Sequence, residues 1–271
     1  TGSLQASFGT AREVASVVIA LVVSTIIFGG IHWISKVSEK VVPFMAAAYI
    51  FATVTIIALH LDQLLPALKS VFSGAFTGTA AMGGFAGATV KMAIQKGVAR
   101  GVFSNEAGMG STPHAHARAV VKNPHCQGLA AMISVFIDTF IVLNLTVFSI
   151  LTTNSLSSVK DGIMLTQYAF STVFGSFGDI FIAICLLFFA FSTILGWHFF
   201  GAINVKHLFG VKATKIYSLI VVIFIIVGST LKVDLVWSLA DFFNGLMVIP
   251  NALALLALSG VVAKICKTYS K

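Results

Sequence analysis

Long apolar runs, separated by short charged stretches, constrain this chain more than any other feature. The runs are about 17–25 residues long, the length that crosses the hydrocarbon core of a bilayer. Only 10% of the residues are charged and 58% are hydrophobic, whereas soluble domains carry about 25% charged residues. The sequence therefore predicts an all-α integral membrane protein. We expect seven spans, the third of them broken, at residues 13–30, 41–59, 70–92, 127–152, 178–203, 213–231 and 234–262. Between them we expect a short turn at 31–40, with Pro43 opening the second span, and a short connector at 60–69.

The basic residues are distributed unevenly between the two sides that these spans define. The net charge is +8, and a strongly basic chain can indicate nucleic-acid binding. Here the segments after the first, third, fifth and last spans hold all basic residues except Arg12, Lys69, Lys160 and Lys232. Because cytoplasmic loops of membrane proteins are enriched in Lys and Arg, the pattern predicts topology, with a cytoplasmic C-terminus. It argues against a nucleic-acid partner.

Glycines interrupt the third expected span, and each costs about 1 kcal/mol in a helix interior. We therefore interpret residues 70–92 as a helix with an unwound centre. Irregular backbone at membrane depth is tolerated where it lines a cavity, and transporters place their sites there. We expect Thr77, Gly78 and Thr79 to end the outer half-helix, and Gly83 and Gly84 to let the backbone approach a small ligand. Close helix packing is the alternative role of these glycines.

Four stretches of the chain resemble the alanine/glycine:cation symporter family, also called the sodium:alanine symporters. They are GVARGVFSNEAGMGSTPHAHA (97–117), AFTGTAAMGGFAGATV (75–90), FAFSTILGW (189–197) and DFFNGLMVIPNALALLALSG (241–260). The resemblance implies a secondary active transporter of the cell membrane, not an enzyme. It would carry a small neutral amino acid, alanine or glycine, into the cell by alternating access, with Na⁺ as the coupling ion.

The resemblance also implies the five-plus-five inverted repeat of the leucine-transporter fold. Residues 1–69 would then be the last two helices of the first repeat, 70–262 the second repeat and 263–271 a cytoplasmic tail, all in one membrane domain. Family members are usually much longer than this chain, so we expect it to be the C-terminal portion of a transporter. Without the N-terminal helices of the same transporter, it would not transport.

Hydroxyl side chains and a tryptophan share the fifth expected span. Ser192 and Thr193 offer hard oxygen donors that suit Na⁺, and adjacent hydroxyl residues on the equivalent helix coordinate sodium in leucine-transporter-type proteins. Trp197 lies on the same helical face as Thr193, and we expect it to wall a pocket for a small substrate. The alternatives are helix–helix hydrogen bonds for the hydroxyls and an interfacial anchor for the tryptophan.

Asp138 lies close to the middle of the fourth expected span, where an ionisable group is expensive and indicates a functional site by default. Thr139 lies beside it, and Asn144 lies closer to the outer end of the span. We interpret Asp138 and Thr139 as part of a cation-binding site that couples transport to Na⁺ or protons. Pairing of Asp138 with a group from the missing helices is the alternative.

Gating residues are expected at two places. Asp241 and Asn244 lie near the outer end of the last span, the level at which a carboxylate latches onto an arginine in the related fold. The sequence offers no arginine at matching depth, so we expect the partner among the missing helices. Glu106 lies in the signature SNEAGMGSTPHAHA, which the charge distribution places in a cytoplasmic loop, and we assign it a structural or gating role. His114 and His116 do not predict a metal site, because alternate residues of a helix do not face each other.

Three other functions remain open at this point. A proton-coupled amino-acid transporter would use Asp138 as its titrating group. A non-functional fragment would share the signature without transport. A seven-helix channel-like or receptor-like protein would have the same topology, but it does not explain the glycine-rich third span.

Overall fold

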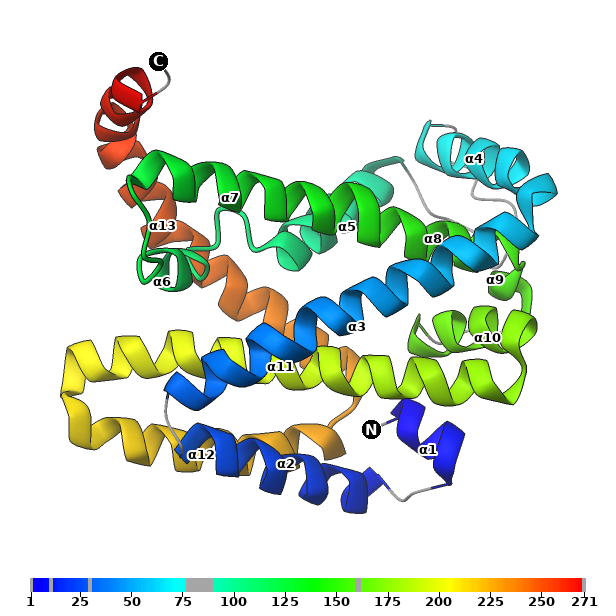
Figure 1. The fold of residues 1–271 in the computed structure, drawn as a ribbon, viewed down its shortest axis with the longest axis horizontal. Helices are drawn as coiled ribbons and strands as arrows, with labels where there is room; N and C mark the ends of the chain where they lie inside the picture. The colour runs from blue at the N-terminus through cyan, green and yellow to red at the C-terminus, as the bar shows by residue number, and fades with distance from the viewer. Residues whose placement is uncertain (1, 10–11, 29–30, 77–89, 159–161, 270–271) are drawn as a thin grey trace. The chain divides into compact units, whose positions relative to one another are not determined.

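The computed structural model describes residues 2–9, 12–28, 31–76, 90–158 and 162–269. Within these ranges the chain forms helices and turns and contains no strand, as the sequence predicts (Figure 1). The helices are α1 (Gly2–Phe8), α2 (Arg12–Phe28), α3 (Ile31–Leu59), α4 (Leu61–Phe76), α5 (Val90–Asn105), α6 (Pro113–His116), α7 (Pro124–Phe136), the π-helical turn η1 (Ile137–Val142), α8 (Leu143–Thr152), α9 (Ser155–Ser158), α10 (Gly162–Phe174), α11 (Ser176–Phe209), α12 (Val211–Thr230) and α13 (Val233–Tyr269).

Among the described residues, five helices are long and apolar enough to cross a membrane. They are Glu39–Leu59, Pro124–Thr152, Ser176–Phe209, Val211–Thr230 and Val233–Tyr269. Each coincides with an expected span, since an apolar run of this length is stable in lipid only as a helix. A shorter apolar helix, Val14–Phe28, coincides with the first expected span. The third expected span, 70–92, lies partly outside the described residues.

The boundaries of two helices differ from the sequence prediction. We expected a turn at residues 31–40 and a span that opens at Pro43, but α3 begins at Ile31 and contains Pro43. We also expected residues 60–69 to be a connector, but most of them belong to α4, which contains Pro66. Proline removes one backbone hydrogen bond without ending either helix, and neighbouring groups in membrane helices compensate such losses.

The chain divides into two compact units, and the first comprises Thr1–Val90 and Leu145–Leu231. Its apolar core lies where α2 and α11 meet, and is formed by Val23, Ile27 and Leu195, with Val221 and Ile225 of α12 packed against it. Polar contacts accompany this packing. The Ser16 hydroxyl of α2 donates to Ser229 of α12 at 2.7 Å, and His198 Nε2 of α11 lies 2.9 Å from the Ser218 hydroxyl of α12.

A second group of contacts in this unit joins α1, α3, α8, α10 and α11. The Ser3 hydroxyl donates to Gln167 Oε1 at 3.1 Å, and Gln167 Nε2 donates to the Ser7 hydroxyl at 2.8 Å. The Tyr49 hydroxyl lies 2.7 Å from the Thr146 hydroxyl, and the Tyr49 ring stacks on Phe170 with centroids 5.8 Å apart. These polar groups are satisfied by one another, which a water-free environment requires.

The second unit comprises Lys91–Asn144 and Lys232–Lys271. It contains most of α5 together with α6, α7, η1 and α13. Only Met109 and Ser111 of its described side chains are buried, each 1% exposed. Both belong to the signature, so this segment forms the centre of the unit. Helix α13 continues to Tyr269, through most of the expected tail 263–271.

Candidate functional site

The signature segment forms a tight turn after α5. Glu106, Gly108 and Gly110 all have left-handed backbone, with φ of 55°, 81° and 86°. Glycine adopts this conformation readily, whereas a glutamate there is strained, and such strain often occurs at functional sites. The Asn105 side chain accepts a hydrogen bond from the backbone N–H of Ala107 at 2.9 Å, which stabilises the reversal. The Glu106 carboxylate accepts a hydrogen bond from the buried hydroxyl of Ser111.

Two side chains at the end of α5 contact the middle of the long helix formed by α7, η1 and α8. The Ser104 hydroxyl donates to the Asp138 carboxylate at 2.7 Å, and Asn105 Nδ2 donates to the Thr139 hydroxyl at 3.2 Å. Asp138 and Thr139 both lie in η1, and π-helical turns are often found at functional sites. Two of the four residues that the sequence predicts for cation binding thus meet the signature.

A third contact joins the signature to α13. Asn251 Nδ2 donates to the backbone carbonyl of Gly108 at 2.8 Å. A side chain at Gly110 would come within 3.0 Å of Asn251, so this turn packs closely on the helix. Asn251 and Asp138 each lie midway along a helix of spanning length. We predicted that the signature lies in a cytoplasmic loop; in the structure its turn folds back against the middles of two apolar helices.

A cavity of about 230 Å³ lies between the signature, α7 and η1. Its polar lining consists of Ser104, Asn105, Glu106, Thr112, Ser134 and Asp138. Carboxylate, hydroxyl and amide oxygens are ligands for hard cations, and carboxylates close together also bind protons. The structure thus brings Glu106, for which we predicted a structural or gating role, to the same cavity as Asp138. The sequence did not indicate this proximity, because it depends on the turn after α5.

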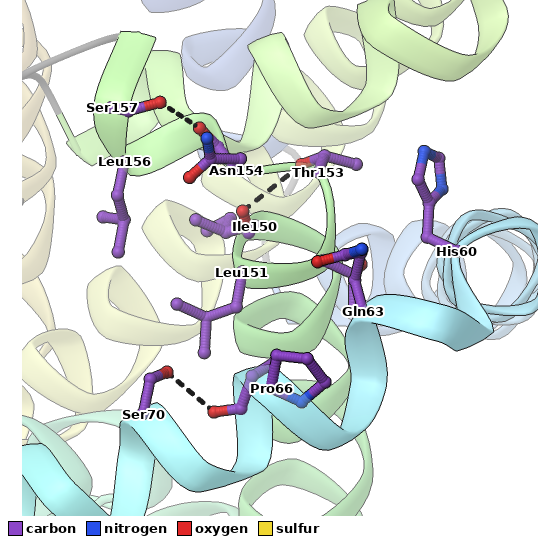
Figure 2. A pocket seen from close by; sticks show the side chains of 12 residues that line it. His60, Gln63, Pro66, Ser70, Ile150, Leu151, Thr153, Asn154, Leu156 and Ser157 are labelled. Carbon is purple, nitrogen blue, oxygen red and sulfur yellow. Dashed lines mark hydrogen bonds between the residues drawn. The ribbon is translucent and has the colours of Figure 1, made fainter. Parts of the chain in front are cut away.

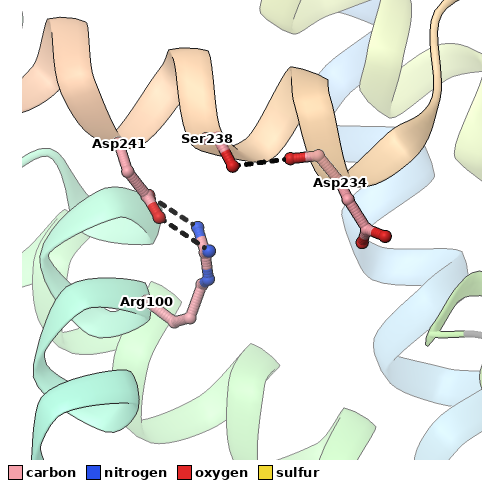
Figure 3. Close-up of polar contacts among 4 residues, drawn as sticks. All are labelled: Arg100, Asp234, Ser238 and Asp241. Atoms are coloured by element: carbon pink, nitrogen blue, oxygen red, sulfur yellow. Dashed lines mark hydrogen bonds and ion pairs between the residues drawn. The ribbon is translucent and has the colours of Figure 1, made fainter.

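Asp241 forms an ion pair with an arginine of this chain (Figure 3). Arg100 Nη1 and Nη2 donate to Asp241 Oδ1 and Oδ2 at 3.0 and 3.1 Å. Nearby on α13, the Ser238 hydroxyl donates to the Asp234 carbonyl at 2.9 Å. The expectation that the partner of Asp241 lies in missing helices is wrong. The charge count assigned Arg100 to the cytoplasmic side, and it missed that α5 lies beside the beginning of α13.

The second residue of the expected gate, Asn244, lines a cavity between α5 and α13. The cavity has a volume of about 400 Å³. Its lining is Gln95, Val98, Ala99, Val102, Phe103, Met109, Asp241, Asn244, Gly245 and Val248. Apolar side chains dominate and a few polar groups converge, which is the usual composition of a site for a small molecule.

The hydroxyls and the tryptophan of the fifth expected span lie on α11, in the other compact unit. The Ser192 and Thr193 hydroxyls donate to the backbone carbonyl of Phe189 at 3.0 and 2.9 Å, and their oxygens keep lone pairs for a cation. Trp197 is half-buried and contacts Phe200 edge-on, with ring centroids 6.0 Å apart. The substrate residues expected in the broken span, Thr77, Gly78, Thr79, Gly83 and Gly84, lie outside the described residues.

A further cavity of about 540 Å³ lies where α4 approaches the end of α8 (Figure 2). Its polar lining includes His60, Gln63, Ser70, Thr153 and Asn154. This cavity was not expected from the sequence, because residues 60–69 were interpreted as a connector rather than as a helix. The signal was present in the leucine spacing of LDQLLPALK, which continues into the apolar residues that follow.

Comparison with known proteins supplies the family. The sequence profile of the sodium:alanine symporter family matches residues 1–271. An uncharacterized transporter of Haemophilus influenzae is 39% identical over 271 residues, covering 99% of this chain and 59% of that protein. The sodium/alanine symporter AgcS of Methanococcus maripaludis is 38% identical over 273 residues, covering 99% of this chain and 59% of that protein.

A probable sodium/glutamine symporter of Bacillus subtilis, GlnT, is 39% identical over 267 residues, covering 98% of this chain and 55% of that protein. The chain thus spans between 55% and 59% of the length of these three relatives. Because the family profile matches residues 1–271, and because five of the described helices have the length and apolar character of membrane spans, this chain belongs to the sodium:alanine symporter family of membrane transporters.

Proposed function

We propose that the protein containing this chain is a symporter that carries a small neutral amino acid, alanine or glycine, into the cell together with Na⁺. Membership in a family of sodium-coupled carriers supports this proposal. The names of two relatives combine sodium with alanine and sodium with glutamine, so amino-acid transport is shared while the substrate varies. Alternating access in a leucine-transporter-type inverted repeat is the mechanism that we propose for it.

The observation that carries the proposal is the oxygen-lined cavity at the signature. Asp138 is held by Ser104, and Thr139 by Asn105, at the middle of a helix of spanning length. A carboxylate at that depth is costly unless a cation or proton neutralises it. We assign Asp138 and Thr139 to a cation site and add Ser104 and Glu106 to it as neighbours in the same cavity.

A second cation site and the substrate site are proposed on other elements. Ser192 and Thr193 present adjacent hydroxyls on α11, the side-chain type that suits Na⁺. Trp197, about one turn further along α11, would limit the size of the substrate side chain. The backbone of the glycine-rich segment at Thr77–Thr79 and Gly83–Gly84 would bind the amino and carboxylate groups.

Proton coupling is the second candidate, and one observation favours it. Glu106 and Asp138 line the same small cavity, and carboxylates within the membrane form proton relays in pumps and transporters. The two candidates predict different driving forces, since a sodium symporter accumulates substrate in a sodium gradient at constant pH. A proton symporter accumulates substrate in a pH gradient without sodium.

Uptake of tritiated alanine into proteoliposomes tests the proposal. We expect an inward sodium gradient at equal pH on both sides to drive accumulation, and replacement of Na⁺ by choline to abolish it. Unlabelled glycine should compete, whereas leucine should not. Accumulation in a pH gradient without sodium would replace the first candidate by the second. Absence of accumulation under both gradients, with glutamine as substrate as well as alanine, would contradict amino-acid symport.

A further inference from the structure

Arg100 forms an ion pair within the second unit and contacts two residues of α13. Its guanidinium forms two hydrogen bonds to the Asp241 carboxylate, at 3.0 and 3.1 Å. The same guanidinium lies 4.1 Å from the centre of the Trp237 ring. Trp237 also meets Phe103, one turn after Arg100, with ring centroids 5.3 Å apart. The second half of α5 is therefore joined to the first turns of α13 through one arginine and two aromatic rings.

This contact is specific in geometry but modest in strength. A planar guanidinium matches a carboxylate with two parallel hydrogen bonds and also stacks on an aromatic face, which a lysine does not reproduce. The Arg100 and Asp241 side chains are 37% and 44% exposed. Ion pairs with this exposure typically contribute less than about 1 kcal/mol. The pair thus favours the observed arrangement of α5 against α13, while an arrangement in which the two helices separate stays accessible.

The pair lies at the edge of the cavity between α5 and α13. Asp241 lines this cavity together with Asn244 and Gly245, which follow it on α13. Met109 closes the cavity on the signature side and is 1% exposed. Any separation of α5 from α13 that exposes Met109 through this cavity must first lengthen or break the contact between Arg100 and Asp241.

We propose that Arg100 is a gating residue, and that its contacts with Asp241 and Trp237 hold the cavity between α5 and α13 in a closed form. The role of the gate in transport rests on the proposed function, but the opening of the cavity does not.

The rate at which a cysteine at position 109 reacts with a methanethiosulfonate reagent measures the opening. Met109→Cys is introduced after Cys126, Cys185 and Cys266 have been replaced by serine, in the purified protein that contains this chain. We expect Arg100→Gln and Asp241→Asn each to raise the reaction rate up to about fivefold, the change that follows from losing about 1 kcal/mol of closure. Val102→Cys, in the wall of the same cavity, provides a second reporter if the first variant does not fold.

Two matched variants separate the pair from a general effect of charge. Lys96→Gln removes a positive charge about one turn earlier on α5, and we expect the reaction rate to stay within about twofold of the parent. The exchange Arg100→Asp with Asp241→Arg restores opposite charges, and we expect it to return the rate toward that of the parent. Equal rates in the parent and in Arg100→Gln would overturn the gate. If the exchange variant reacts as fast as Arg100→Gln, the ion pair is not what keeps the cavity closed.

Uptake and binding measurements distinguish a gate from a brace that only supports folding. For Arg100→Gln we expect the maximal uptake rate to change by about fivefold or more while the dissociation constant for alanine stays within about twofold. A parallel loss of binding, uptake and folded protein would overturn the gating role. Absence of uptake in the parent protein contradicts the proposed function alone, because the cysteine reaction needs neither substrate nor sodium.

Discussion

Gly178 lies where two helices approach each other so closely that no side chain fits. A Cβ atom at this position would overlap the backbone carbonyl of Phe170 and come within 3.1 Å of the Cβ of Phe174. Phe170 is fully buried and stacks on Tyr49, so it has little freedom to move. The glycine therefore permits α11 to begin directly beside the end of α10.

Gly178→Ala should lower the stability of the protein in detergent by about 1–3 kcal/mol, the usual cost of overpacking. The melting temperature of the purified protein measures the effect. Gly228→Ala in α12 is the matched control, because nothing lies within 4 Å of the added atom. Alanine is the better helix former there by about 1 kcal/mol, so the control should melt at the same or a higher temperature. Equal melting temperatures of the two variants would show that α10 moves to accommodate the added methyl group.

At the scale of elements, a long apolar run predicts reliably that a helix forms. It predicts poorly the residues at which the helix begins and ends. The expected spans coincide with helices because lipid leaves an apolar run no other way to satisfy its backbone. Pro43 was expected to open a span and so misplaced the beginning of α3, since proline usually stands in the first turn of a helix rather than in its interior. The connector expected at residues 60–69 belongs mostly to α4. The π-helical turn η1 has no sequence signal that we recognised. Only its residues Asp138 and Thr139 were expected to be functional.

Asp138→Asn tests the site that this turn holds. The amide keeps the size of the side chain and an oxygen that accepts from Ser104, so we expect normal folding by size-exclusion chromatography. Sodium-driven accumulation of alanine should fall at least about tenfold, because the cation loses a charged ligand in a poorly hydrated site. Asp179→Asn is the control, since Ser7 bonds the backbone carbonyl of this residue rather than its carboxylate. Unchanged accumulation, with unchanged sodium and pH dependence, would exclude Asp138 from coupling.

At the scale of the molecule, the membrane class and the family were predicted from the sequence. The contacts between residues far apart in the sequence were not predicted. Asp138 was expected to be functional because a charge in an apolar run is costly. Its contact with Ser104 depends on the reversal at Glu106, Gly108 and Gly110, which the sequence indicates only as a turn. Arg100 was assigned by charge count to a loop. A count of basic residues assigns a segment to the correct side of the membrane only when that segment lies outside the membrane.

The prediction at the scale of the molecule is the side of the membrane on which the C-terminus lies. Lys264 and Lys267 flank Cys266 on the last turns of α13, and a basic end predicts the cytoplasmic side. Cys266 is exposed. With Cys126 and Cys185 replaced by serine, we expect an impermeant maleimide to label inside-out vesicles and to spare right-side-out vesicles. The reverse pattern would place the C-terminus outside the cell. Labelling of the detergent-solubilised protein is the control, because it shows that the thiol of Cys266 can react.

The π-helical turn η1 has a consequence for the long helix that contains it. Relative to an uninterrupted α-helix, a π turn acts as a one-residue insertion, and each residue of a helix corresponds to a rotation of about 100°. The side chains in the turn are therefore offset from the positions that a continuation of α7 would give them. Asp138 and Thr139 thereby meet Ser104 and Asn105. Deleting Ile137 would turn both side chains by about 100° and away from these partners, although composition and hydropathy would hardly change.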